Sequence, residues 1–218
     1  MPRGYVAILG GYWLRLIDFK LYAITNRRLC KPRLIQDYVA SLLDIGVRAI
    51  QLREKDLSDT ELRSIAVPIN QICKAYSAKL FINSNINIAV DAGVDGVHLP
   101  GSLLDTIQNA KARNLLVGCS VHDLDVAKKM QVAGANFVTY SPIYPTISKS
   151  NPAVGLKSLR RIVGSLDIPV FALGGMTPGK VSECLNSGAF GVAAMSSIMS
   201  YGTGIDQAKN YLKQIEEY

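Results

Sequence analysis

A joint between a helical pattern and a short β-branched run recurs along this sequence, and it constrains the fold more than any other feature. In each copy a glycine ends a helical stretch and an apolar run follows within a few positions. The copies span 45–50, 92–97, 133–138 and 187–192. Glycine is favoured just past a helix because it adopts left-handed backbone angles without a Cβ clash. The pattern predicts the αβ joints of βαβ units, and therefore a parallel sheet.

Eight short apolar segments are predicted as the strands of this sheet. They span 21–25, 49–52, 80–83, 96–99, 115–119, 137–140, 170–173 and 191–194. Helical patterns lie between them, for example over 33–43 and 60–76, and Asp59 suits the N-cap of the second. Eight strands alternating with helices favour a closed (β/α)8 TIM barrel, an α/β fold, over an open doubly wound sheet. No strand is followed by GxGxxG, which disfavours dinucleotide binding.

Composition and the chain start set the remaining expectations. The 24 Lys and Arg against 17 Asp and Glu give a net charge of +7, which favours anionic ligands, but they are scattered rather than clustered as in a nucleic-acid arm. The four cysteines form no CxxC, which fits a reducing cytoplasm.

Residues 1–17 are predicted to be an N-terminal extension of a single barrel domain over 18–218. No segment reaches the roughly 18 apolar residues that span a bilayer. We expect a cytoplasmic protein with a small-molecule substrate, no nucleic acid and no membrane partner, and a homo-oligomer stays open.

Polar residues directly after the strands are the candidate ligand-binding residues, because TIM barrels bind ligands at the carboxyl ends of their strands. After the second strand, alternation sends Gln51, Arg53 and Lys55 to one side. Two cations at a barrel mouth suit a phosphate or a diphosphate. The alternative is a charged strand end paired with neighbouring carboxylates.

Two further strand ends carry candidates. Asn83 follows the third strand, where a turn or a helix cap would also explain a small polar residue. Ser120 and His122 follow the fifth strand, and an imidazole titrating near neutral pH suits proton transfer. The alternative for His122 is a local hydrogen bond at a helix N-terminus. His98, in contrast, is expected to pack at a strand end.

A long loop over 141–149 follows the sixth strand. It contains several hydroxyl side chains, Thr146 among them, and the cation Lys149. A loop of this length and composition can close over an anionic ligand. An ordinary surface loop is the alternative.

The last two strand ends predict a phosphate site. Gly174 and Gly175 follow the seventh strand, and Ser196 and Ser197 follow the eighth. Glycines permit close backbone approach, and helix N-termini present free N–H groups to an anion. Phosphate sites recur at this pair of loops in TIM barrels.

Together these motifs resemble the family of thiamine phosphate synthases and TenI-like proteins. The resemblance runs from about Lys20 to the C-terminus and includes QLREK at 51–55, GVHL at 96–99, GCSVH at 118–122, SPIYPTISK at 141–149, GGMTP at 174–178 and AMSSI at 194–198. It implies an enzyme of thiamine biosynthesis. The synthases join a hydroxymethylpyrimidine diphosphate to a thiazole phosphate with Mg²⁺ and release diphosphate. The TenI-like proteins aromatise a thiazole carboxylate phosphate by moving a proton.

The resemblance also implies roles for the candidate residues. Gln51, Arg53, Lys55, Asn83, Ser120, Thr146 and Lys149 would line the diphosphate and pyrimidine side. Gly174, Gly175, Ser196 and Ser197 would hold the thiazole phosphate.

Two departures from the synthase pattern bear on the metal. Ser84 and Leu103 stand where synthases carry aspartates that serve Mg²⁺, and Asp105 comes two positions late. Mg²⁺ takes oxygen ligands and usually one or two carboxylates, so we expect no metal site here.

These departures favour a thiazole tautomerase, an isomerase without a cofactor in which His122 moves the proton. The intact QLREK and PTISK elements favour the alternative, a thiamine phosphate synthase, a transferase that would use Mg²⁺ at a rearranged site. A third hypothesis is a non-catalytic protein that binds thiazole or thiamine phosphates.

Overall fold

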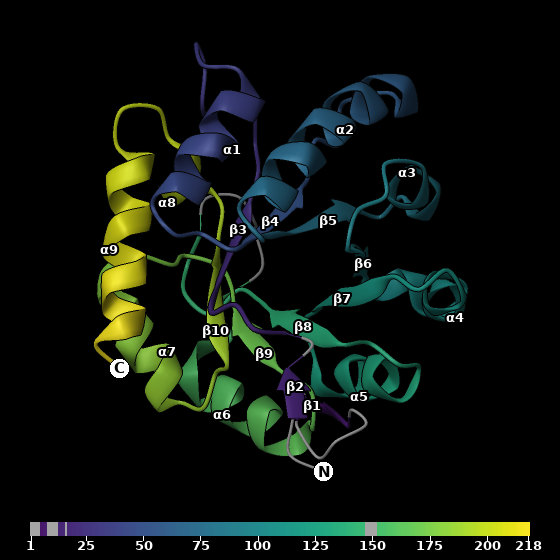
Figure 1. Ribbon diagram of the computed structural model, residues 1–218. Helices are drawn as coiled ribbons and strands as arrows, with labels where there is room; N and C mark the ends of the chain where they lie inside the picture. Colours follow the sequence, from purple (N-terminus) through teal and green to yellow (C-terminus); the bar gives the residue numbers. More distant parts are fainter. Residues whose placement is uncertain (1–4, 8–12, 16, 147–151) are drawn as a thin grey trace.

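Eight parallel strands close into a barrel in the computed structural model, which describes residues 5–7, 13–15, 17–146 and 152–218. The strands follow chain order, and the last pairs with the first. They are β3 (Leu21–Ile24), β4 (Ala49–Leu52), β5 (Lys79–Asn83), β6 (Gly96–Pro100), β7 (Leu116–Val121), β8 (Phe137–Tyr140), β9 (Val170–Ala172) and β10 (Gly191–Ala194). The helices surround this ring (Figure 1). The predicted (β/α)8 barrel is confirmed.

The helices of the described chain follow the strands in alternation. They are α1 (Ile35–Asp44), α2 (Asp59–Ala75), α3 (Ile86–Asp91), α4 (Ile107–Ala112), α5 (Leu124–Val132), α6 (Gly155–Ser165), α7 (Val181–Asn186), α8 (Ser196–Met199) and α9 (Gly204–Glu216), with 3-10 turns η1 (Gly101–Thr106) and η2 (Pro178–Lys180). The N-cap of α2 is Ser58, so the expectation for Asp59 was wrong by one residue. Ser58 forms a capping box with Glu61, which satisfies two backbone N–H groups at once.

The glycine joints have the geometry that the sequence predicted. Gly46, Gly93, Gly134 and Gly188 have φ values of +106°, +62°, +101° and +88°. Each turns the chain from a helix into the next strand. The repeated pattern therefore marks αβ joints at all four positions.

Aromatic side chains fill the barrel interior. Phe19, Phe81, Phe137 and Phe171 pack with ring centroids 5.3–6.0 Å apart. Glycine faces them where space is short: a Cβ on Gly118 would lie 2.3 Å from Cζ of Phe137. The interior is a packed core, and it forms a rigid floor for the carboxyl ends of the strands.

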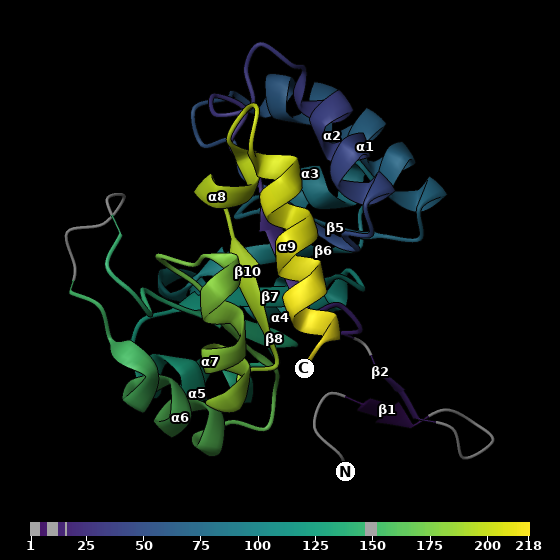
Figure 2. The same ribbon diagram turned by 90° about the vertical axis from the view of Figure 1, so that its left-hand side faces the viewer.

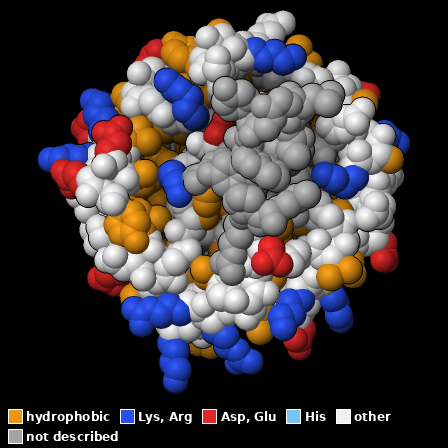
Figure 3. All heavy atoms as spheres, turned by 60° about the horizontal axis from the view of Figure 1, so that its bottom comes forward, with side chains coloured by type: hydrophobic (Ala, Val, Ile, Leu, Met, Phe, Trp, Pro, Cys, Tyr) orange, Lys and Arg blue, Asp and Glu red, His pale blue; other side chains and the backbone are white. Residues whose placement is uncertain are grey.

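An antiparallel hairpin, β1 (Tyr5–Ala7) with β2 (Trp13–Arg15), precedes the barrel and is drawn apart from it in Figure 2. The domain boundary at residue 17 stays a prediction. None of the described helices is long and apolar enough to cross a membrane. On the face shown in Figure 3, Lys and Arg side chains form separate groups around the edge, with acidic side chains between them.

Candidate active site

A cavity of about 400 Å³ opens at the carboxyl ends of the barrel strands. Most of the predicted site residues line it: Gln51, Arg53, Asn83, Ser120, Thr146, Gly174, Gly175, Ser196 and Ser197. His98, Ser141, apolar residues of β3 and β10, and apolar residues of the loops after β8, β9 and β10 complete the wall. The loops after β4, β8, β9 and β10 thus meet at one cavity with the ends of other strands, as the barrel rule requires.

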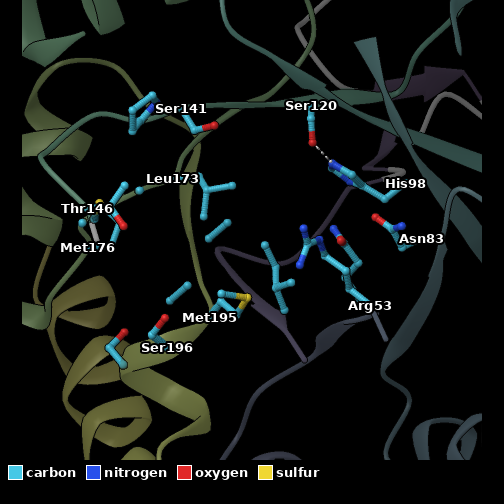
Figure 4. Close-up of a pocket in the computed structure, with 18 residues that line it drawn as sticks. Arg53, Asn83, His98, Ser120, Ser141, Thr146, Leu173, Met176, Met195 and Ser196 are labelled. Atoms are coloured by element: carbon cyan, nitrogen blue, oxygen red, sulfur yellow. Dashed lines mark hydrogen bonds between the residues drawn. The ribbon is translucent and has the colours of Figure 1, made fainter. Parts of the chain in front are cut away.

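The cavity has two chemically different ends. Arg53, Asn83 and His98 lie on one side, and Thr146, Met176 and Ser196 lie on the opposite side (Figure 4). One end therefore offers a cation and amides, and the other offers hydroxyls and the backbone of the β9 and β10 loops.

Arg53 dominates the cationic end. Its half-buried guanidinium forms no ion pair with any carboxylate of the described residues. Burial lowers the pKa of Arg53, and the nearby charge of Glu54 opposes that shift. A partly desolvated guanidinium without a protein partner is a strong binding group for a phosphate or diphosphate.

His98 lies inside the barrel at the cavity floor, where only 2% of its surface is exposed. Its Nε2 is 2.9 Å from Oγ of Ser120, and its Nδ1 is 3.4 Å from the hydroxyl of Tyr22. Gln51 donates to that hydroxyl over 3.3 Å. Burial, with a smaller effect of the Arg53 charge, lowers the pKa of His98 to about 3. The ring is therefore neutral at pH 7.

Sequence reasoning placed His98 at a strand end and missed its place in the cavity wall. The signal was the alternation along β6. Gly96 faces the barrel interior, because a Cβ there would lie 2.8 Å from the Phe81 ring. Two residues further on, His98 shares that face.

The other end of the cavity is built by direct contact between two loops. Gly174 and Gly175 have φ values of +96° and +62°. A Cβ on Gly174 would lie 2.7 Å from Cα of Pro142, and a Cβ on Gly175 would lie 2.5 Å from the carbonyl oxygen of Pro145. The first half of the β8–α6 loop thus rests on the glycine backbone, which brings Thr146 to the cavity wall.

Lys180 ties these two loops together from below. Its Nζ donates to the carbonyl of Gly175 over 2.8 Å and lies 4.3 Å from the ring centroid of Tyr144. The Tyr144 hydroxyl donates to Glu183 over 2.9 Å. These contacts fix the described part of the loop against the backbone of the cavity wall.

Ser196 and Ser197 begin α8, where backbone N–H groups have no intrahelical acceptor. Both residues line the cavity. Oγ of Ser197 is 3.0 Å from the hydroxyl of Tyr211, which holds that side chain in place. These two serines thus line the same cavity as the glycine loop after β9.

Two predicted site residues do not line the cavity. His122 is exposed and is not among the described residues that line the cavity. Its Nδ1 is 2.6 Å from the carbonyl oxygen of Ser141, which only accepts, so Nδ1 carries the proton. Lys55 lines an adjoining pocket of about 360 Å³ that shares Asn83 with the cavity. Lys149 lies outside the described residues.

Ser84 and Leu103, the two positions that depart from the synthase pattern, have structural contacts in this barrel. Ser84 has φ +63°, and its N–H donates to the carbonyl of His98 over 2.9 Å. Leu103 packs against the hydrophobic core. The described residues contain no group of three or more His, Cys, Asp or Glu side chains that could hold a metal ion. Neither position supplies a carboxylate, which is a ligand that Mg²⁺ usually takes in proteins.

Comparison with known proteins matches this geometry to one family. The sequence profile described as thiamine monophosphate synthase matches residues 21–198. The putative thiamine-phosphate synthase 2 of Aquifex aeolicus is 40% identical over 183 residues, which cover 83% of this chain and 97% of that protein. The thiamine-phosphate synthase of Pyrococcus furiosus is 34% identical over 91% of this chain and 95% of its own.

A solved structure agrees with the sequence matches. The thiamine phosphate pyrophosphorylase from Pyrococcus furiosus superposes with a TM-score of 0.83 at 33% identity, covering 91% of this chain and 96% of that chain. The shared barrel, the matched residues and the lengths covered lead to one conclusion. This chain belongs to the thiamine monophosphate synthase family.

Proposed function

We propose that this protein is a thiamine phosphate synthase, a transferase that joins a hydroxymethylpyrimidine diphosphate to a thiazole phosphate and releases diphosphate. The observation that carries the proposal is the cavity with two ends, each suited to one phosphorylated substrate. The names of the relatives support the same reaction. The tautomerase, which the sequence favoured, has less support.

The reaction needs two substrates held together and a stabilised leaving group. The lone pair of the thiazole nitrogen forms a bond to the methylene carbon of the pyrimidine, and the bond from that carbon to the diphosphate oxygen breaks. The electron pair leaves with the diphosphate. Arg53 would stabilise the charge that develops there, because its guanidinium is already partly desolvated.

The remaining residues would orient the substrates. Asn83 and Gln51 would hold the pyrimidine end through amide hydrogen bonds, and Ser196, Ser197 and the backbone after β9 would hold the thiazole phosphate. Fixing both reactants in one geometry removes much of the entropic cost of a two-substrate reaction.

The tautomerase remains a second candidate on one observation, the lack of a metal-holding side-chain cluster among the described residues. Its proposed acid/base group, His122, is exposed and hydrogen-bonded to Ser141. A proton transfer to a ligand in the cavity would require His122 to turn inward. This requirement is why we place the synthase first.

The test is to mix the purified protein with the pyrimidine diphosphate and the thiazole phosphate, with and without Mg²⁺, and to detect thiamine phosphate by mass spectrometry. We expect product, and we expect Arg53→Gln to lower kcat/KM by at least about 100-fold. Arg113→Gln is the matched control: this exposed arginine donates to Asn87 and Asn109 and is not among the described residues that line the cavity, so kcat/KM should stay within about twofold.

Absence of product beside a working synthase overturns the proposal. Aromatisation of the thiazole carboxylate phosphate, lost in His122→Ala, would then establish the tautomerase. Ligand binding without either activity would establish a binding protein.

A further inference from the structure

Glu54 is a buried carboxylate that follows Arg53 in the chain but pairs with other groups. Only 5% of its surface is exposed. Its Oε1 accepts from the hydroxyl of Thr25 over 2.6 Å, and both its oxygens accept from the backbone N–H of Arg27 over 3.1 and 3.0 Å. The guanidinium of Arg27 lies 3.4 Å from Oε2. All of these donors come from the loop that follows β3.

Thr25 connects this carboxylate to the backbone of Arg53. Its hydroxyl gives its one hydrogen to Glu54 and accepts from the N–H of Arg53 over 3.0 Å. Thr25 is fully buried, and its own N–H donates to the carbonyl of Gln51. One hydroxyl therefore fixes both the direction of Glu54 and the position of the Arg53 main chain.

Arg27 is itself held in the orientation that faces Glu54. Asp56 accepts from both of its terminal nitrogens, over 2.6 and 2.9 Å, and also from Arg28 over 2.6 Å. Bidentate arginine–carboxylate pairs are geometrically specific. The two loops after β3 and β4 are thus joined by these contacts.

We infer that Thr25 and Arg27 are positioning residues that hold Glu54 away from the guanidinium of Arg53, so that Arg53 is available to the diphosphate of a substrate. The inference rests on the proposed function for the identity of that anion. A buried carboxylate is stable only when it is paired. Without its partners from the β3–α1 loop, Glu54 would take the adjacent guanidinium, and an incoming anion would have to displace it.

The first test is Thr25→Val, which keeps the shape of the side chain and removes the hydroxyl. In this variant Glu54 loses its hydrogen bond from Thr25 and gains an ion pair with Arg53 that competes with the ligand. We therefore expect the Kd of inorganic diphosphate, measured by calorimetry, to rise at least about tenfold. In turnover, KM for the pyrimidine diphosphate should rise more than kcat falls. Thr25→Ser should restore binding.

The matched control is Thr106→Val. The hydroxyl of Thr106 donates to the carbonyl of Leu103, and Thr106 lines neither pocket. This variant removes the same group from another part of the barrel, and its Kd for inorganic diphosphate should equal that of the wild type. Arg27→Met is a second test variant should Thr25→Val fold poorly, and it should weaken diphosphate binding in the same way.

The double variant Thr25→Val with Glu54→Gln separates a positioning role from a general structural one. Removing the charge of Glu54 removes the competitor, so diphosphate binding should recover toward the wild-type value. Unchanged binding in Thr25→Val and Arg27→Met overturns the inference, and so does weaker binding in the double variant than in Thr25→Val. Lack of diphosphate binding by the wild type overturns the proposed function and the inference with it.

Discussion

The side chains around His98 set the protonation state of this residue at the cavity floor. His98 is enclosed by Ser120, by the Tyr22 hydroxyl and by the Phe137 ring, whose centroid lies 5.8 Å away. Because burial keeps its pKa low, it enters the folded state without a proton over the whole neutral range. The positive charge of this end of the cavity therefore comes from Arg53 and not from the imidazole.

The buried imidazole makes stability depend on pH. Its folded pKa of about 3 lies below its usual value of 6.5, so between these values the unfolded chain binds a proton that the folded chain does not. The free energy of unfolding should fall on acidification below pH 6.5, by about 1.4 kcal/mol per pH unit from this group. His98→Gln should remove that part of the slope in urea titrations from pH 7 to 4.5. Equal slopes for the two proteins would contradict this.

Several residues of the site could be predicted from sequence because the strand pattern located them. Arg53, Asn83 and Ser120 directly follow or end predicted strands, and barrel geometry then brings them to one face. His122 differs because the chain leaves β7 after Val121, and the ring turns toward the carbonyl of Ser141. Local alternation cannot foresee that rotation.

Glu54 was missed for another physical reason. Its partners Thr25 and Arg27 lie 29 and 27 residues away in the chain, and nothing in the local pattern links them. Only the pairing of β3 with β4 in the sheet brings the two loops together.

Between elements, the decisive contact is the β8–α6 loop resting on the two glycines after β9. Loop composition suggested a segment that closes over a ligand, but its described half is already fixed by Gly174, Gly175 and the Lys180 contacts. The glycines were predicted for phosphate binding. The structure adds that they also receive the neighbouring loop.

Gly175→Ala tests this contact. The new Cβ would meet the carbonyl of Pro145 at 2.5 Å, so the loop must move, and we expect thiazole phosphate to bind at least about tenfold more weakly. Gly155→Ala is the matched control. Gly155 has a similar φ of +74° but nothing within 4 Å of a Cβ, so this variant carries only the backbone strain. Equal effects on thiazole phosphate affinity, measured by calorimetry, would contradict the loop contact.

For the molecule as a whole, the aromatic interior joins all parts of the barrel into one folding unit. Rings from β3, β5, β8 and β9 meet Phe19 at the centre. The fold class and the eight barrel strands could be predicted from periodicity and glycine joints. The packing of aromatic rings against glycines such as Gly118 could not be predicted from the sequence, because it depends on which strands become neighbours.

Phe171→Ala should therefore destabilise the entire domain. Deleting a fully buried ring costs about 3–5 kcal/mol, a large part of a typical total of about 5–15 kcal/mol. Urea unfolding followed by circular dichroism and by fluorescence should show one shared transition at a lower midpoint. Tyr201→Ala, at a side chain that is 56% exposed, is the control and should shift the midpoint little.

The backbone at Ser84 has a consequence for how this scaffold can be altered. Its φ of +63° is a left-handed conformation that aspartate adopts more readily than most residues with a side chain. Ser84→Asp would therefore place a carboxylate beside Asn83 without rebuilding the end of β5. Position 84 can therefore exchange a hydroxyl for a carboxylate while the glycine loop after β9 stays unchanged.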